Sequence, residues 1–423
     1  MGKHRKENAG SQFTSYRINN LMNDIIMDKF LRICSDFCTG CGLCHSVADV
    51  SFSTDEKGFK TPVLSEKEIP LLKQVCPSAG NALNNYSDGS IWGVVKNAYL
   101  GNAVDEDVRF KASSGGVITA LCLYLIDNNF VEGIIQTRKH SEDPRLTETI
   151  VSSSREDVMA CCGSRYTTSS PLMQIKQQVK PGKQYAFVGK PCDVSALRMF
   201  QRTSSEEWVG QIKFMLTFYC AGQPSINANN KLLSELGCKD VKDCEDLRYR
   251  GYGWPGKAMA KMRDGTENTM EYEHLWMKIL GRDTRRICRF CTDGTGEYSD
   301  ISCGDAWYLD SNNHPDFTER PGRNIVFART VDGCSLMEAA IRDGYINAEV
   351  FSMSRSDEIK LFQPYHYTRK ASLSTLKIAM RLCGRDFPLY DMGKLNKFAK
   401  GFPLKGKLYR FLGTLQRIKQ GKI

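Results

Sequence analysis

Cysteines are concentrated in one short stretch, CSDFCTGCGLC, which runs from Cys34 to Cys44. Three of them have the spacing C-x2-C-x2-C, which lets one tight loop wrap three thiolates around an iron-sulfur cube. A fourth ligand has to come from elsewhere, and ferredoxin-type sites commonly supply it as a cysteine followed by proline, a pair that occurs once downstream, at Cys76. The spacing therefore predicts a 4Fe-4S cluster held by Cys38, Cys41, Cys44 and Cys76.

Two alternatives stay open for this site. Zinc also accepts four thiolates, but structural zinc sites usually draw them from two C-x2-4-C pairs and not from a triplet and a distant single cysteine. Cys34 could replace Cys76 as the fourth ligand, although no proline follows Cys34. The cluster on Cys76 is the favoured interpretation.

Composition sets the cellular context of these cysteines. The chain has 423 residues, 41% hydrophobic and 25% charged, which predicts two or three domains. No apolar run approaches the length of a membrane span, and the first thirty residues lack the apolar stretch of a signal peptide, so we expect a cytoplasmic protein. Thiols are kept reduced there, and 17 cysteines then favour metal ligation over a disulfide framework.

The order of patterns along the chain divides it into four segments of an α+β (mixed α/β) protein. A polar lead-in with a short helix is expected over residues 1–33, and a small ferredoxin-like 4Fe-4S module, held mainly by its metal, over 34–90. Strands then alternate with helices over 91–365, which predicts a catalytic domain with a mostly buried mixed sheet. A basic helical tail over 366–423 completes the division.

Two short motifs of the third segment suggest an anion site. The first is Ser113, Ser114, Gly115 and Gly116, small residues that open a helix and leave its N–H groups free for the phosphates of a dinucleotide. The second is Gly163, Ser164, Arg165 and Tyr166, in which arginine could meet a phosphate and tyrosine could stack on a ring. An ordinary N-cap and a surface turn explain the same residues.

Four further cysteines predict a second site. Cys192 and Cys220 each follow an apolar strand, at the carboxyl end where open α/β sheets collect ligands. Cys288 and Cys291 form a C-x2-C pair, which is compatible with zinc, a redox dithiol or half of a cluster. Together the four could form another set of thiolate ligands.

No general acid can be assigned from the sequence. Asp305 and Tyr252 are weak catalytic candidates because they adjoin motifs expected to line the site, the second within the glycine-rich loop RGYGWPG. A structural role explains both equally well.

These motifs, in this order, resemble the beta-subunit family of coenzyme F-420 hydrogenases and dehydrogenases, which includes the plant 7-hydroxymethyl chlorophyll a reductase. The resemblance covers roughly residues 34–365 through CTGCGLC, SSGGVITALCLYL, GSRY, GKPCDVSALR, FYCAGQPS, RGYGWPG and CRFCTDGTGEYSDISCGDAW. It implies an iron-sulfur flavoprotein with FAD near SSGG and GSRY, and a 4Fe-4S cluster on Cys192, Cys220, Cys288 and Cys291. It leaves open the use of coenzyme F-420 and the roles of Cys161, Cys162 and Cys303.

The last segment carries most of the net charge of +10. From residue 366 onward there are fourteen Lys and Arg but only two Asp. A helical face is expected to combine Leu404, Leu408, Phe411, Leu412, Leu415 and Ile418. It could lie on an anionic membrane, cover the domain core or dock an acidic partner such as ferredoxin. Nucleic acid is not an expected partner, because the body lacks basic residues interleaved with aromatics.

The favoured function is an oxidoreductase. Electrons would pass from a ferredoxin-like one-electron donor, or a deazaflavin, through two 4Fe-4S clusters to FAD and on to a small or lipid-linked organic substrate. The alternatives are an electron-transfer subunit without its own substrate and a zinc-stapled binding protein. Contact with the inner face of the membrane and assembly into a homo-oligomer stay open.

Overall fold

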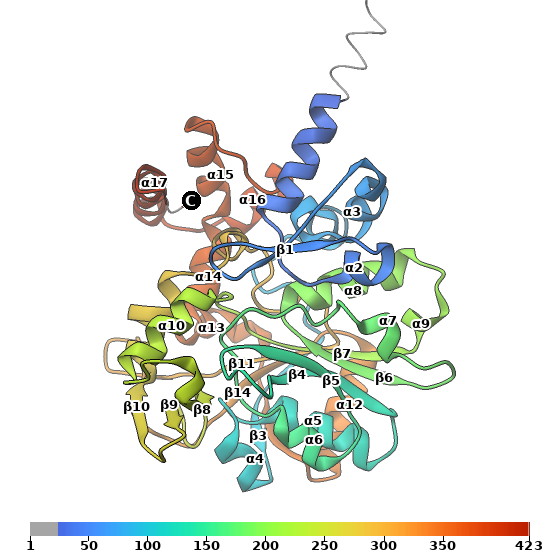
Figure 1. Ribbon diagram of the computed structural model, residues 1–423, viewed down its shortest axis with the longest axis vertical. Coiled ribbons are helices and arrows are strands. Elements are labelled where there is room, and N and C mark those ends of the chain that lie inside the picture. The colour runs from blue at the N-terminus through green and yellow to red at the C-terminus, as the bar shows by residue number, and fades with distance from the viewer. Residues whose placement is uncertain (1–23, 422) are drawn as a thin grey trace, which may run out of the picture.

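A mixed eight-stranded sheet forms the centre of the protein in a computed structural model that describes residues 24–421 and 423 (Figure 1). Four neighbouring strands, β11, β7, β6 and β4, run parallel, and antiparallel strands flank them on both sides. From edge to edge the sheet consists of β15 (Ile346–Val350), β3 (Asn97–Ala103), β14 (Asn324–Ala328), β11 (Ile301–Asp305), β7 (Ile212–Phe218), β6 (Tyr185–Gly189), β4 (Gly133–Lys139) and β5 (Thr147–Ser152). The expected mixed sheet and α/β character are confirmed.

Helices cover both faces of this sheet, which explains why its central strands are apolar almost throughout. All five residues of β6 are buried. One face packs against α5 (Val117–Asp127), α6 (Arg155–Ala160) and α12 (Val331–Arg342), with α4 (Glu106–Lys111) beside α5. The other face packs against α7 (Ile175–Gln178), α8 (Pro191–Thr203) and α9 (Glu207–Gly210). The carboxyl edge of the parallel strands is left between these layers.

A second, smaller sheet stands beside the first and has a core of its own. Its three antiparallel strands are β8 (Cys244–Arg248), β9 (Lys257–Met262) and β10 (Glu267–Glu271). Helix α10 (Ile226–Glu235) covers this sheet, and the short α11 (Tyr272–His274) leads back from it. A short pair, β12 (Tyr308–Leu309) and β13 (Pro315–Asp316), lies further along the chain.

The amino-terminal module is small and has little regular structure. A helix over residues 24–36 leads into it, and the expected lead-in before residue 24 lies outside the described residues. Its elements are α2 (Leu43–Ala48), β1 (Phe52–Thr54), β2 (Lys60–Pro62) and α3 (Ile69–Val75). As expected, α3 ends immediately before Cys76. The ferredoxin-like character of the module stays a prediction.

The expected basic tail is helical, but much of it belongs to a core. It contains α14 (Pro364–Ala371), α15 (Leu373–Leu382), α16 (Met392–Phe398) and α17 (Leu404–Lys419), and α13 (Ser356–Phe362) precedes it. Leu373, Met380 and Phe398 pack in one cluster with Ile33 and Phe37 of the amino-terminal segment. The proposed division at residue 366 falls inside α14, so 364–398 act as a structural partner of the amino-terminal module.

None of the helices in the described part of the chain is both long enough and apolar enough to cross a membrane.

Candidate functional site

The main cavity lies at the carboxyl edge of the parallel strands and has a volume of about 580 Å³. Gly189 at the end of β6, Phe218 at the end of β7 and Asp305 at the end of β11 all line it. This is the edge at which open α/β sheets bind ligands, because strand ends and helix starts meet there. Its volume is within the range of cofactor and drug-sized sites.

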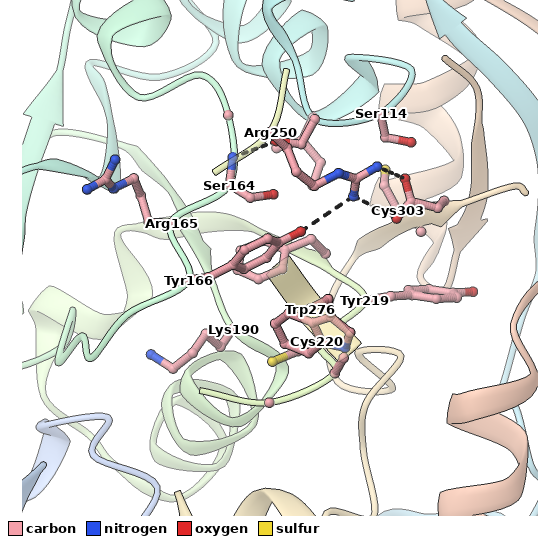
Figure 2. A pocket seen from close by; sticks show the side chains of 18 of the residues that line it. Ser114, Ser164, Arg165, Tyr166, Lys190, Tyr219, Cys220, Arg250, Trp276 and Cys303 are labelled. Carbon is pink, nitrogen blue, oxygen red and sulfur yellow. Dashed lines mark hydrogen bonds and ion pairs between the residues drawn. The ribbon is translucent and has the colours of Figure 1, made fainter. Parts of the chain in front are cut away.

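The two motifs expected to contact FAD meet in this cavity, as Figure 2 shows for Ser114, Ser164, Arg165 and Tyr166. The Ser164 N–H donates to Ser113 Oγ at 2.7 Å and thereby joins the motifs. Gly116 caps α5 with φ of 79°, a left-handed conformation that favours glycine. The cavity is lined by Ser113, Ser114, Gly116, Gly163, Ser164, Arg165 and Tyr166; of the expected residues only Gly115 does not line it.

The expected phosphate contact from Arg165 is restricted by its own hydrogen bonds. Its Nη1 donates to the Leu247 carbonyl at 2.7 Å, and its Nη2 donates to the Pro144 carbonyl. Its buried Nε has no hydrogen-bond partner among the described residues. The guanidinium therefore joins the loop between β4 and β5 to β8, and the expected phosphate contact stays a prediction.

Sequence reasoning missed a pair of charges on the cavity wall. Arg250 forms two hydrogen bonds to Asp305, of 3.0 and 3.1 Å, and Trp254 Nε1 donates to the same carboxylate at 3.0 Å. Arg250 also reaches Tyr166 Oη at 3.4 Å (Figure 2). Both oxygens of Asp305 thus accept hydrogen bonds from protein side chains, and its catalytic role stays a prediction. Tyr252 is half-exposed, packs on Phe110, and does not line the cavity.

Two further polar groups of the cavity have no protein partner. Tyr219 Oη and His366 Nε2 are buried without a hydrogen bond in the described part of the chain, and both residues line the cavity. Burial, with the nearby Arg369 charge, lowers the pKa of His366 to about 3, so its imidazole is neutral at pH 7. Both atoms are covered by neighbouring protein atoms, so the structure does not place them within reach of a ligand in the cavity.

Lys190 supplies a positive charge between the cavity and the second set of cysteines. Its Nζ lies 2.8 Å from Asp193 Oδ2 and donates to Ser169 Oγ at 2.7 Å. Burial lowers the pKa of Lys190, but the charge and hydrogen bond of Asp193, together with Cys192 and Cys220, outweigh that effect and raise the pKa overall. The lysine therefore stays protonated. Lys190 belongs to the sequence Gly-Lys-Pro. This sequence predicts a turn, but it does not predict that the lysine is buried.

The four cysteines of the first expected site act on one another electrostatically. The charges of Cys38 and Cys76 add to burial in raising the pKa of Cys41 to about 12, and the same neighbours raise the pKa of Cys44. The Gly40 N–H donates to Cys38 Sγ at 3.2 Å, a contact of the kind that tunes cluster thiolates. The loop and the distant Cys76 are thus brought together.

Cys34 lies beside this set but differs from its members. It is buried, whereas Cys38, Cys41, Cys44 and Cys76 are partly exposed. Contact with Cys76, together with burial, raises the pKa of the Cys34 thiol. The choice of Cys76 over Cys34 as the fourth ligand stays a prediction.

The four cysteines of the second expected site are likewise neighbours. Burial raises the pKa of Cys192, and the charges of Cys220 and Cys291 raise it further. Burial also raises the pKa of Cys220 to about 12, with Cys288 and Cys291 adding to the effect. The Gln223 N–H donates to Cys288 Sγ at 3.3 Å. Cys192 and Cys220 therefore lie near Cys288 and Cys291, as the proposed site requires.

Two buried arginines support the cysteine sets, and sequence reasoning assigned neither. Arg369 of α14 donates to the carbonyls of Cys220 and Ala221, each at 3.0 Å. Arg285 donates to the Cys38 carbonyl at 3.2 Å and to Gln223 Oε1 at 2.8 Å. Arg285 therefore connects the loops of both sets. Arg369 could not be singled out from the sequence, because it is one of many basic residues in the tail. Composition does not show which of them is buried.

Asp193 and Tyr390 lie between the two sets. The charge of Asp193 raises the pKa of both Cys41 and Cys192, and its Oδ1 is buried without a hydrogen-bond partner among the described residues. Burial raises the pKa of Tyr390 well above its usual value, and Cys291, Cys76 and Cys192 contribute to that rise. The two sets are therefore adjacent, and Cys220 of the second one lines the cavity.

The eight expected ligands all have part of their surface uncovered by protein. Cys161, Cys162 and Cys334 share this partial exposure, whereas Cys34, Cys122, Cys238, Cys244 and Cys303 are buried. Within the described residues, no three or more His, Cys, Asp or Glu side chains are close enough to hold one metal ion. A cube of four irons is larger than a single ion, so its thiolates stand further apart, and the donor set of four cysteines suits it.

The cysteines that the family pattern left unexplained also lie near the cavity. Cys161 and Cys303 line it, and the Thr119 hydroxyl donates to Cys162 Sγ at 3.6 Å. Burial raises the pKa of Cys303, which keeps that thiol protonated. These thiols form part of the cavity wall next to α5.

Two models of one protein family match this chain. The amino-terminal model of the coenzyme F420 hydrogenase/dehydrogenase beta subunit matches residues 98–176, and its carboxyl-terminal model matches residues 182–353. The chain belongs to this family. The first model contains both expected FAD motifs, and the second contains Cys192, Cys220, Cys288 and Cys291. The first cysteine set and the helices after residue 353 lie outside both.

The relatives are named as subunits of redox enzymes. The chain is 25% identical to an F420-dependent formate dehydrogenase subunit beta from Methanocaldococcus jannaschii, over 58% of this chain and 59% of the relative. It is 23% identical to a coenzyme F420 hydrogenase subunit beta from Methanococcus voltae, over 61% of this chain and 85% of the relative. Family members are thus oxidoreductase components.

A solved structure shares the fold. A chain of the F420-reducing [NiFe] hydrogenase complex from Methanosarcina barkeri superposes with a TM-score of 0.52 at 19% identity. The match covers 70% of this chain and 97% of that one. The remaining 30% of this chain lies outside the match.

Proposed function

We propose that the protein is an iron-sulfur flavoprotein oxidoreductase of the cytoplasm. Cys38, Cys41, Cys44 and Cys76 would hold one 4Fe-4S cluster, and Cys192, Cys220, Cys288 and Cys291 would hold a second. FAD would occupy the cavity at the edge of the sheet. Electrons from a one-electron donor such as ferredoxin, or from a deazaflavin, would reach an organic substrate through these three groups.

The observation that carries this proposal is the arrangement of the cysteine sets. They flank Asp193 and Tyr390, and the second set reaches the cavity through Cys220. A relay requires neighbouring redox centres in series, and this order gives a first site, a second site and a cofactor cavity. A pair of unrelated structural metal sites would not require the shared residues between them.

The residues around the proposed centres have distinct roles. Arg369 and Lys190 place buried positive charges beside the second set, which favours the thiolate form of its cysteines. Gly40 and Gln223 donate N–H groups to sulfur and would set the potentials. Ser113, Ser164 and the α5 start would bind the phosphates, while the rings of Tyr166 and Trp276, inclined to each other by 57°, line the cavity. FAD, when bound, supplies the exchange between electron pairs and single electrons.

A second candidate function is an electron-transfer subunit without its own substrate. The names of the relatives favour it, because they describe subunits of hydrogenase and formate dehydrogenase. Turnover of an added substrate by the isolated chain with reduced ferredoxin would support the enzyme, and a stable partner that co-purifies would support the subunit.

The test is a cofactor analysis of protein purified without oxygen. We expect a brown protein with broad visible absorbance, releasable FAD and about eight iron atoms per chain. Cys192→Ser should lose about half of the iron, while the matched control Cys383→Ser, at an exposed position outside both sets, should keep it. A colourless protein that contains zinc and no iron would refute the proposal and favour a zinc-stapled binding protein.

A further inference from the structure

The outer face of α17 is unusually apolar for a surface helix. Leu404 is 81% exposed, Tyr409 is 77% exposed, and Leu408 and Leu412 are each more than half exposed. The helix buries its other side, where Thr414 is covered and Ile418 packs on the core shared with the amino-terminal segment. The expected apolar face is therefore divided, and only part of it covers the protein.

This face belongs to a part of the chain with charge of one sign. No acidic residue occurs after Asp391, whereas lysines and arginines recur throughout the same segment. Lys405 and Lys419 are exposed on α17 itself. In Figure 1, α17 and α15 lie together at the helical end of the molecule, away from the small sheet.

A second and independent feature adjoins α17. An open hollow lies between α15, α16 and the start of α17, and three lysines line it, Lys397, Lys400 and Lys407. Hydroxyl and amide groups of Ser374, Thr375 and Asn396 line it too, together with the exposed Ile378. None of the three lysines forms an ion pair with any residue that the structure describes. Such a donor set suits a phosphate group.

We propose that this end of the protein binds the surface of an anionic phospholipid membrane. Leu404, Leu408 and Leu412 would enter the interfacial region, and the lysine-lined hollow would hold a headgroup phosphate. A helix with exposed leucines and flanking lysines has the composition of an interfacial helix. Lysines near an anionic membrane surface are attracted to its lipid headgroups.

The charge pattern favours a membrane over the other occupants considered for this helix. The protein core does not cover these leucines, because they are exposed in the folded chain. An acidic protein such as ferredoxin would match the lysines, but it would not require a row of leucines one turn apart beside them. Binding to a membrane would locate the proposed oxidoreductase at a lipid surface. This binding does not depend on the proposed cofactors.

The test is flotation of the full-length protein with vesicles. We expect the protein to float with vesicles of phosphatidylcholine and phosphatidylglycerol, not with pure phosphatidylcholine, and less at high salt. A variant with Leu404→Ser, Leu408→Ser and Leu412→Ser, and another with Lys397→Gln, Lys400→Gln and Lys407→Gln, should each bind at least about tenfold more weakly. The control carries Val331→Ser and Val350→Ser, which alter exposed apolar residues on other elements.

Several outcomes would overturn the inference. The first is that the protein does not float with anionic vesicles, and the second is that the control variant loses as much vesicle binding as the test variants. The third is that the protein binds inorganic phosphate or reduced ferredoxin but no vesicles, and that the three lysine substitutions abolish this binding. Thermal midpoints equal to that of the wild type would show that the variants are folded. The leucine variant should also keep the iron and flavin content of the wild type, so failure here is distinguishable from failure of the proposed function.

Discussion

At the scale of single residues, Cys34 and Cys76 are the two alternatives that sequence spacing leaves for the fourth ligand of the first proposed cluster. Both lie beside the C-x2-C-x2-C loop, but Cys34 is buried whereas Cys76 is partly exposed. A cluster has to reach the sulfur of each of its ligands, so the partly exposed cysteine is the better candidate. The proline after Cys76 favours the same assignment.

We therefore expect different effects from serine at these two positions. Cys76→Ser should lose about half of the iron of the anaerobic protein, because one of two proposed cubes loses a ligand. Cys34→Ser should retain the iron, because its hydroxyl can still donate to Cys76, although the visible spectrum should shift. Iron analysis of the two variants side by side provides the measurement; loss of iron from Cys34→Ser alone would reverse the assignment.

At the scale of elements, the segment after residue 364 has two different parts. Helices α15 and α16 contribute Leu373, Met380 and Phe398 to a core that also contains Ile33 and Phe37. Helix α17 contributes less, because leucines of one face remain exposed. Basic composition described both parts alike and so predicted one tail.

A pair of substitutions measures this difference. Phe398→Ala should lower the free energy of unfolding by about 3–5 kcal/mol, because a fully buried ring is removed from a shared core. Leu404→Ala should change it by less than about 0.5 kcal/mol, because the side chain is exposed. Urea unfolding followed by circular dichroism would give both values. Similar small effects would show that the carboxyl-terminal helices are a detachable tail.

Sequence pattern predicted elements better than it predicted their partners. The apolar run YAFVG became β6, and the small residues before Val117 became the start of α5. Spacing also selected eight cysteines that the fold gathers into two neighbourhoods. It did not predict Arg285 or Arg369 as their supports, because the contacts that bury these two cations span more than a hundred residues and leave no local pattern.

At the scale of the whole molecule, the main cavity is a junction of several cores. Cys303 belongs to the main sheet, Trp276 packs with the small sheet, and His366 comes from α14. A ligand that fills the cavity would therefore contact parts of the chain that otherwise meet only at their edges. Binding should stabilise the molecule as a unit.

FAD should accordingly raise the thermal midpoint of flavin-depleted protein. At a free concentration about one hundred times the dissociation constant, it should add about 2.7 kcal/mol to the free energy of unfolding. Riboflavin, which lacks the phosphates, should shift the midpoint less, because it cannot use the start of α5. Differential scanning calorimetry over a range of FAD concentrations would measure this. A thermal midpoint that FAD does not change would contradict the proposal that FAD binds in the cavity.

The core formed by Phe37 and Phe398 also governs the order in which the protein can be completed during its synthesis. The first cysteine loop leaves the ribosome long before the helices that pack beside it, so the nascent chain presents those thiols without their cover. The amino-terminal module can acquire this cover only after Phe398 has been synthesised. Insertion of the proposed cluster would then be a late step, and a chain that stops before Phe398 would leave those thiols open to oxidation.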